Sequence, residues 1–372
     1  MGIKTIIMIL ASLSFSVSAL AEDGGEKKPF SISGDFATSI QFYDNENQNG
    51  DHDEFNIDLA EIDLEKNWSK SKLHLSIGYG ATANGINPSV TAGAATDSGG
   101  DTYVLGTPTN SLNLMNAYYS MDTSYGLNFM IGKFESTVGH ETYNHRENSQ
   151  YTRSYAYQLA PIFSTGAGLS YGQDMWSAGL IVSNGQGSET DRGDNNKTMG
   201  LIVDVDPMDN LHIDLNYVTG SESSVAAGGL YAVNILDVSA AFMINEMIDV
   251  ALNYIDMGAK PTGGTEAKAN SIALYGNANF GMFGLGLRYE MFSYDAGMIG
   301  YNNGAALGFG ATGADNDISA ITLTAKAEID QNAMVLLEYR MDSSDDKIWM
   351  EKDGTTAADA VNTITAAVMY TF

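Results

Sequence analysis

Apolar and polar side chains alternate with a period of two along many segments of the chain. In 283–291 the odd positions hold Phe, Leu, Leu, Tyr and Met, and the even positions between them hold Gly, Gly, Arg and Glu. The same alternation runs through 71–81, 211–217, 321–329 and 363–372. This is the period of a β-strand that has one apolar and one polar face. The pattern therefore predicts an all-β chain.

The alternating segments are long enough to cross a bilayer as tilted strands, which takes about 9–11 residues. A soluble sandwich would also alternate, but strand length and tyrosines near strand ends, as at Tyr79 and Tyr289, favour a membrane barrel. The sixteen expected strands are 30–43, 53–66, 71–81, 112–122, 126–134, 163–172, 175–183, 198–206, 211–219, 229–244, 248–257, 270–280, 283–294, 317–330, 332–342 and 360–372. The second changes phase between Leu59 and Ile62, which indicates either a bulge or a misplaced strand.

The connections between these segments alternate in length. Seven are short, such as 172–175 and 330–332, and eight are expected to be long, such as 82–111, 220–228 and 258–270. Short periplasmic turns and long extracellular loops are typical of outer-membrane proteins. An open sheet edge in lipid would leave backbone groups unpaired, so the sheet is expected to close. We predict a transmembrane antiparallel up-and-down β-barrel of about 16 strands over 30–372.

The first residues have the pattern of a secretory signal peptide. Residues 1–21 hold an early lysine, a short apolar run and the small residues Ala19-Leu20-Ala21, which predicts cleavage after Ala21. Residues 22–29 are then a short periplasmic segment, too short for a plug domain. No later stretch offers about 18 uninterrupted apolar residues, so no spanning helix is expected. The prediction is export to the periplasm and insertion into the Gram-negative outer membrane.

Composition agrees with an exported barrel. The chain has no cysteine, 40 glycines, 20 tyrosines and a formal net charge of −28. Such an acidic chain does not bind nucleic acid non-specifically. The acids gather in the expected loops, where divalent cations can join them to lipopolysaccharide phosphates. The expected partners are thus the lipid bilayer, lipopolysaccharide and small hydrophilic solutes.

The last segment carries a recognisable ending. Alternating apolar residues lead to Tyr370 and Phe372, with no polar tail after them. This ending resembles the C-terminal assembly signal of Gram-negative outer-membrane barrels. The resemblance implies recognition by the barrel-assembly machinery.

Residues 113–171 contain a set of motifs that can be compared with a known family. They are Asn116-Ala117-Tyr118, Gly132-Lys133-Phe134, Gly139, Glu141, Asn144, Arg153-Ser154, Pro161, Phe163 and Thr165-Gly166. In these residues the segment resembles the OmpL-like beta-barrel porin family. The resemblance implies a channel for small solutes, and no substrate site is carried over from it.

Inward-facing charges would set the selectivity of such a channel. By phase, three neighbouring strands present a mixed patch of six charges to the lumen. These are Arg288, Glu290, Lys326, Glu328, Glu338 and Arg340. The patch either sets a field across the pore or forms a salt-bridge ladder that stiffens the wall. Asp214 is a further pore-lining candidate, and Asp35, Asp204, Glu61 and Asp63 lie on other polar faces.

Loop 135–162 is the candidate constriction loop. It is among the longest connections, has Lys133 at its root and contains Arg146 and Arg153, which we count among the pore-lining residues. The alternative is an external lid that stays outside the pore. Because carboxylates are in excess over the whole chain, we expect a weak preference for cations.

Neither a catalytic site nor a metal site is expected. His140, Glu141 and His145 lie close together, but their spacing departs from the i, i+4 histidine pair of a zinc protease. Residues 45–56 resemble a calcium loop in part, although Asn56 stands where a bidentate Glu is needed. No cofactor is expected, and a barrel phospholipase or protease is disfavoured because no supported nucleophile motif is present.

The function predicted from these features is passive diffusion of small hydrophilic solutes and ions through a porin. The alternative is a non-conducting barrel that serves as an adhesin or structural anchor. By analogy with sixteen-stranded general porins, a homotrimer is possible.

Overall fold

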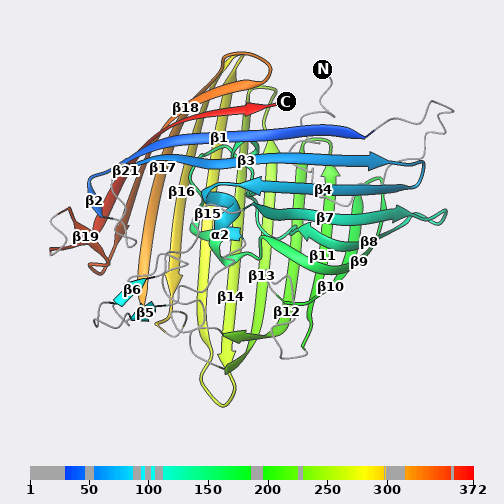
Figure 1. Ribbon diagram of the computed structural model, residues 1–372, viewed down its shortest axis with the longest axis horizontal. Coiled ribbons are helices and arrows are strands. Elements are labelled where there is room, and N and C mark those ends of the chain that lie inside the picture. Colours follow the sequence, from blue (N-terminus) through cyan, green and yellow to red (C-terminus); the bar gives the residue numbers. More distant parts are fainter. Residues whose placement is uncertain are drawn as a thin grey trace.

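A closed antiparallel β-barrel of sixteen strands makes up most of the protein. The computed structural model describes residues 30–46, 54–86, 94–96, 102–104, 112–185, 196–224, 229–296, 298, 315–352 and 356–372. The predicted signal peptide, 1–21, and the segment 22–29 lie outside these residues. Figure 1 shows the strands following one another around the barrel.

Each barrel strand pairs with the strands that precede and follow it, and the first pairs with the last. The closing pair is extended by hydrogen bonds between the backbones of Gly34 and Phe372. The strands are β1 (Ser31–Tyr43), β3 (Glu54–Asn67), β4 (Ser71–Tyr79), β7 (Asn113–Asp122), β8 (Leu127–Glu135), β9 (Phe163–Gln173), β10 (Trp176–Ser183), β11 (Thr198–Met208), β12 (Leu211–Ser224), β13 (Gly229–Met243), β14 (Ile248–Pro261), β15 (Ala267–Phe280), β16 (Phe283–Tyr294), β17 (Asn316–Glu328), β18 (Ala333–Ser344) and β21 (Ala360–Thr371). The sixteen strands predicted from the alternation are thereby confirmed.

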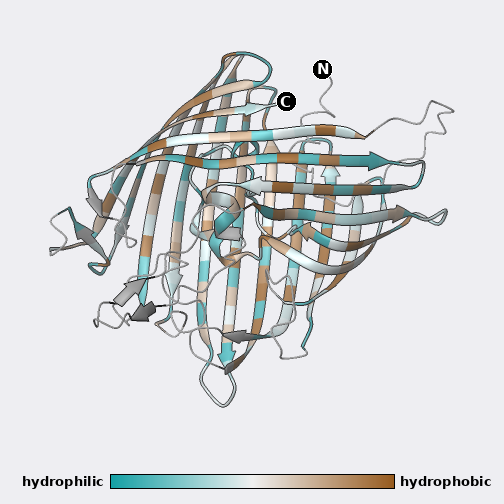
Figure 2. Cartoon of the chain, viewed as in Figure 1, coloured by the Kyte–Doolittle hydropathy of each residue, from teal (hydrophilic) through white to brown (hydrophobic). Residues whose placement is uncertain are grey.

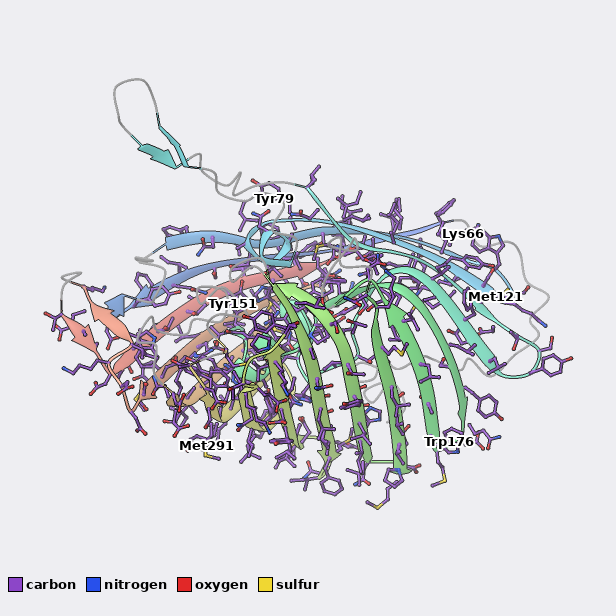
Figure 3. The ribbon with its side chains drawn as sticks, turned by 90° about the horizontal axis from the view of Figure 1, so that it is seen from below. Lys66, Tyr79, Met121, Tyr151, Trp176 and Met291 are labelled. Atoms are coloured by element: carbon purple, nitrogen blue, oxygen red, sulfur yellow. The ribbon has the colours of Figure 1, made fainter. Side chains whose placement is uncertain are left out.

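The apolar face of each strand points outward. Along β16 the five outward side chains are between 40% and 58% exposed, whereas Arg288 and Glu290 between them are buried. Figure 2 shows the resulting alternation of brown and teal bands along the strands. In Figure 3, Met291 and Trp176 lie at the outer edge of the barrel and Tyr151 lies within it. An apolar outer face is what lipid contact requires.

Two connections predicted to be long are short. β12 and β13 remain paired as far as Ser224 and Gly229, and β14 and β15 as far as Ala259 and Ala267. The predicted loops 220–228 and 258–270 are therefore partly strand. The apolar outer pattern stops near Tyr217, but the backbone ladder continues with polar residues on its outer face.

The irregularity in β3 is a bulge. Thr38 of β1 pairs with Ile57 and Ala37 pairs with Leu59, so Asp58 is the extra residue. Asp58 and Leu59 are both buried, and Glu61 then faces the interior. The bulge lies just before the phase change seen in the sequence, and it turns consecutive side chains into the lumen.

Short helices and strands lie in the connections between the barrel strands. The strands β2 (Asn45–Glu46), β19 (Trp349–Glu351) and β20 (Ala357–Ala358) form one small sheet, and β5 (Ala94–Thr96) and β6 (Thr102–Val104) form another. Helices α2 (Ala81–Ile86), η1 (His145–Glu147) and α3 (Tyr155–Leu159) lie in connections. Within the described part of the chain, every helix is too short or too polar to cross a membrane.

Candidate functional site: a loop across the barrel lumen

The connection between β8 and β9, residues 136–162, folds into the barrel; we call it the inner loop. β8 stops pairing with β7 at Ala117 and Lys133 but stays paired with β9 as far as Glu135. Gly132 is required at the point of departure. Its φ is +132°, and an added Cβ would lie 2.1 Å from the carbonyl oxygen of Ala117. Lys133 then donates its Nζ proton to the carbonyl oxygen of Leu114 at 2.7 Å.

The inner loop is held together by its own polar side chains. Asn144 caps η1 by accepting from the Arg146 amide, and Ser154 caps α3 by accepting from the Tyr157 amide. The Arg153 guanidinium donates to the carbonyl oxygens of Tyr151 and Tyr143, at 2.8 and 2.7 Å. These bonds give a compact segment that can dock as a unit.

One side of the inner loop is anchored to β16 by buried charges. Arg288 donates to Glu141 Oε1 and to the carbonyl oxygen of Thr152, both at 2.7 Å. Glu290 accepts from the Ala156 amide at 3.0 Å. The side chains of Arg288 and Glu290 have no exposed surface. Hydrogen bonds to charged groups contribute about 1.5–3 kcal/mol each, so the docked conformation is strongly favoured.

The anchoring continues on β18. Glu338 accepts from the amides of Tyr151 and Thr152, at 2.7 and 2.9 Å. Arg340 donates to the carbonyl oxygen of Arg153 at 2.6 Å. Because these side chains satisfy backbone groups of the loop, they replace the hydrogen bonds that the loop would otherwise make with water.

Further side chains of the inner loop contact β3 and α2. Tyr151 donates its hydroxyl proton to Asp58 Oδ2 at 2.5 Å, and Tyr143 donates to Glu61 Oε1 at 2.8 Å. His145 forms a hydrogen bond with Thr82 of α2 at 2.8 Å. In the closed strand order, β8 and β9, from which the loop departs, lie across the barrel from β16 to β18, so the contacts with β16 and β18 mean that the loop crosses the lumen.

Apolar packing covers the wall beneath α3. Tyr155, Ala156 and Leu159 belong to a buried cluster that also contains inward side chains of β12–β17. The rings of Tyr155 and Phe292 are stacked with centroids 4.9 Å apart. The part of the lumen around α3 is therefore filled by protein.

Within the described part of the chain, two cavities border the inner loop. The acidic cavity, about 530 Å³, lies between the loop and strands β1, β3, β4, β7, β8 and β10. The turn-side cavity, about 620 Å³, lies near the short turns and is bordered by Arg146 and Lys326. Asp35, Asn144 and Glu147 border both cavities, so the tip of the loop separates them.

Carboxylates outnumber cationic groups in both cavities. The acidic cavity has six carboxylates against Lys72 and His74. Those six are Asp35, Glu61, Asp63, Glu65, Glu135 and Glu147. Oxygens of Asp35, Glu61 and Asp63 lie within 4.8 Å of one another, close enough to surround one cation. We call these three residues the carboxylate cluster.

Protonation within the inner loop follows from burial and from the neighbouring charges. Burial alone would raise the pKa of Glu141, but Arg288, Arg153 and the Ser154 amide outweigh it and lower that pKa below its usual value. Burial, together with the charges of Asp35 and Asp63, raises the pKa of Glu147.

The His-Glu-His motif of the inner loop is dispersed. Burial lowers the pKa of both His140 and His145, so each is neutral at pH 7. His140 packs on Tyr275, His145 packs on Tyr151, and Glu141 binds Arg288. The partial calcium loop, 45–56, lies mostly outside the described residues.

The pore-lining candidates fall into two groups. Arg146, Lys326 and Glu328 border the turn-side cavity. The remaining seven border neither of the two cavities. Four of these, Arg288, Glu290, Glu338 and Arg340, are covered by the inner loop and hold it in place. The other three are Lys133 and Arg153, which bind backbone carbonyls, and Asp214, which accepts from His212 Nε2 at 2.8 Å.

Sequence reasoning missed several residues that hold the loop. Asp58, Asp237 and Asp342 each accept a hydrogen bond from it. The phase of β18 indicates that Asp342 faces inward with Glu338 and Arg340, and this signal was available. Asp58 lies in the bulge, where the alternation is interrupted and does not predict which way a side chain points.

Comparison with known proteins agrees with this architecture. Residues 30–372 match the model of the family described as "Putative beta-barrel porin-2, OmpL-like". Among curated proteins no match was found.

Solved outer-membrane structures share the fold at low sequence identity. OmpT of Vibrio cholerae, in its trimer form, has a TM-score of 0.62 at 12% identity, covering 92% of this chain and 99% of that one. The anion-selective porin of Comamonas acidovorans has a TM-score of 0.62 at 11% identity, covering 92% and 99%. OmpF of Salmonella typhi, in complex with daunomycin, has a TM-score of 0.61 at 12% identity, covering 93% and 98%.

Proposed function

Since the chain belongs to the OmpL-like beta-barrel porin family, we propose that it is a passive diffusion channel for small hydrophilic solutes and ions in the Gram-negative outer membrane. The observation that supports this most strongly is the inner loop, which crosses the lumen yet leaves a polar cavity of about 530 Å³ beside it. Transport of this kind depends on pore size and inward charge, and it requires no covalent chemistry.

The proposed route follows the acidic cavity along β1, β3, β4, β7, β8 and β10. The opposite wall is covered by the inner loop and its apolar cluster. With six carboxylates facing one lysine and one histidine, the potential along this route is negative. We therefore expect the channel to prefer cations, unlike the anion-selective porin of Comamonas acidovorans.

Planar bilayer recordings of the refolded protein test this proposal. We expect single-channel steps, and a reversal potential in a potassium chloride gradient that reports potassium preference. Swelling of liposomes loaded with sugars of graded size gives the size limit. An anion preference would refute the proposed route, and an absence of conductance would favour the adhesin or anchor instead.

The proposed partners follow from the same location. The apolar outer face is expected to contact lipid, with lipopolysaccharide around the long loops, and Tyr370 and Phe372 are expected to serve the barrel-assembly machinery. A homotrimer is a further proposal, supported by the trimer form of OmpT. Cross-linking in native outer membranes measures the oligomeric state directly.

A further inference from the structure

We infer that the acidic cavity is a binding site for organic cations in which a primary ammonium group carries an apolar body. This inference deepens the proposed function and rests on it, because it names a class of solute for the same route. It follows from the unlike walls of the cavity, since β1 and β3 supply carboxyl oxygens, whereas β7, β8 and β10 supply apolar side chains. The cavity volume of about 530 Å³ suits a small organic molecule.

The wall formed by β1 and β3 can hold the ammonium group. Oxygens of the carboxylate cluster, Asp35, Glu61 and Asp63, lie within 4.8 Å of one another. Glu61 is 3% exposed, and the hydrogen bonds that Ser76 and Tyr143 donate to it both end on Oε1. Within the described part of the chain, Oε2 of Glu61 accepts no hydrogen bond, so it is open to a donor in the cavity. An ammonium group has three N–H donors and no acceptor, so converging oxygens match it.

The cationic side chains of the cavity leave this wall negative. Lys72 Nζ lies 2.5 Å from Glu65 Oε2, and His74 Nε2 lies 3.2 Å from Asp63 Oδ1. In the described structure neither of these cationic groups pairs with Asp35. The three carboxylates Asp35, Asp63 and Glu65 alone outnumber Lys72 and His74, and the excess attracts a positively charged solute.

The wall formed by β7, β8 and β10 can hold the apolar body. Tyr118, Met130, Phe134 and Ile181 all border the cavity, and with Ile202 they form one packed cluster. An alkyl or aromatic group that lies on such side chains is removed from water, which favours binding. A hydroxylated group would lose hydrogen bonds with water there, and these side chains replace few of them.

His74 of β4 connects the two walls. It contacts the Asp63 carboxylate at 3.2 Å, and its ring stacks on the Tyr118 ring with centroids 5.3 Å apart. The carboxylates and the aromatic side chain are therefore separated by one imidazole ring, a distance that a single small molecule can span. The cavity thus suits a charged group and an apolar body in the same ligand.

Block of the potassium current in planar bilayers tests the inference on the refolded full chain at pH 7. The probes are benzylammonium and protonated glucosamine. Each joins one primary ammonium group to a six-membered ring, but only the second ring is hydroxylated. We expect half-block of the wild type at a concentration about fivefold lower for benzylammonium than for glucosamine, because only benzylammonium buries an apolar group.

Two methionine variants locate the apolar contact. Met130 borders the acidic cavity and Met334 borders the turn-side cavity, so Met130→Gln and Met334→Gln are matched. Met130→Gln should raise the half-blocking concentration of benzylammonium about threefold and leave that of glucosamine unchanged. Met334→Gln should change neither. Asp63→Asn should weaken block by both probes, since it removes a charge that both ammonium groups use.

Three results would overturn the inference. They are equal half-blocking concentrations of the two probes in the wild type, an equal change in both methionine variants, and undiminished block in Asp63→Asn. A wild-type channel that conducts but gives any of these results leaves the porin proposal standing. Calorimetric titration of the refolded barrel with both amines measures binding without conductance. A silent wild-type protein would therefore refute the porin proposal, while the titration still decides the binding preference.

Discussion

Arg288 illustrates how single residues position the inner loop. Its guanidinium is buried and contacts Glu141, Thr152 and Thr322. Removing one partner of such a buried pair costs about 3–5 kcal/mol, because the remaining charge is left uncompensated. The pair therefore fixes the position of the loop, while water and solutes contact other residues.

For a single residue, the sequence predicts whether a strand side chain faces inward or outward. It does not predict whether other parts of the protein cover that side chain. The alternation in β16 gives Leu287 as outward and Arg288 as inward, and both orientations are observed. Whether an inward side chain meets water or protein depends on contacts between distant segments. Tyr151 and Asp58, for example, are 93 positions apart, and no local pattern joins them.

Acid should change the channel in two steps, because two loop carboxylates have pKa values displaced in opposite directions. The pKa of Glu147 is raised, so it loses its charge above the usual value of about 4.3. The pKa of Glu141 is lowered, so its bond to Arg288 is intact above that value and is lost only as the pH falls through the lower one. We expect potassium preference to decline first and loop docking to fail later.

Bilayer recordings from pH 8 to pH 3 can separate these steps. The permeability ratio reports the charge of the cavity, and open-channel current noise reports loop docking. In Glu147→Gln the ratio should be lower at pH 7 and decline less on acidification, with the noise onset unchanged. Noise that rises before the ratio declines would contradict the assignment of Glu141 as the later group.

Among the elements, β16 provides the surface on which the inner loop rests. Gly286 faces the loop, and an added Cβ would lie 2.8 Å from Gln150 Nε2 and 3.2 Å from the carbonyl oxygen of Ser149. Gln150 is buried, so its side chain has little room to move. A glycine in this strand lets the loop backbone approach the wall closely.

Gly286→Val should displace the inner loop. Overpacking of this kind costs about 1–3 kcal/mol, which here acts on loop docking. Trypsin should then cleave at Arg146 or Arg153 in the detergent-solubilised variant, and conductance should change. Gly276→Val on β15 is the matched control, because an added Cβ there has nothing within 4 Å. Equal protection of both variants would show that Gly286 is not a contact on which docking depends.

The elements themselves were largely predictable, since each strand carries its own alternation. The strand bounds were harder to predict at the outer ends of β12–β15. There the backbone pairing continues beyond the last apolar residue of the outer face. The sequence does not decide whether loop 135–162 forms a constriction in the pore or an external lid. Its many tyrosines suited either environment, and their partners lie on other strands.

The whole molecule has a low wall and a high wall. β4, β8 and β10 have 9, 9 and 8 residues, whereas β12, β13, β14 and β15 have 14, 15, 14 and 14. The apolar cluster beneath α3 lies on the high wall, and the acidic cavity borders the low wall and the longer strands β1 and β3. On the high wall, the lumen is packed around α3 and open at the turn-side cavity.

The position of the barrel in the membrane can be tested by placing an arginine at two different depths on the outer face of one strand. Leu287 lies near the middle of the outer face of β16, and Phe283 lies at its turn end. An arginine should cost about 2–4 kcal/mol of unfolding free energy at the bilayer midplane and about 0–1 kcal/mol near the interface. Leu287→Arg should therefore destabilise the refolded barrel more than Phe283→Arg does. Urea unfolding in lipid vesicles measures both, and equal costs would mean that β16 does not span the bilayer with these faces and depths.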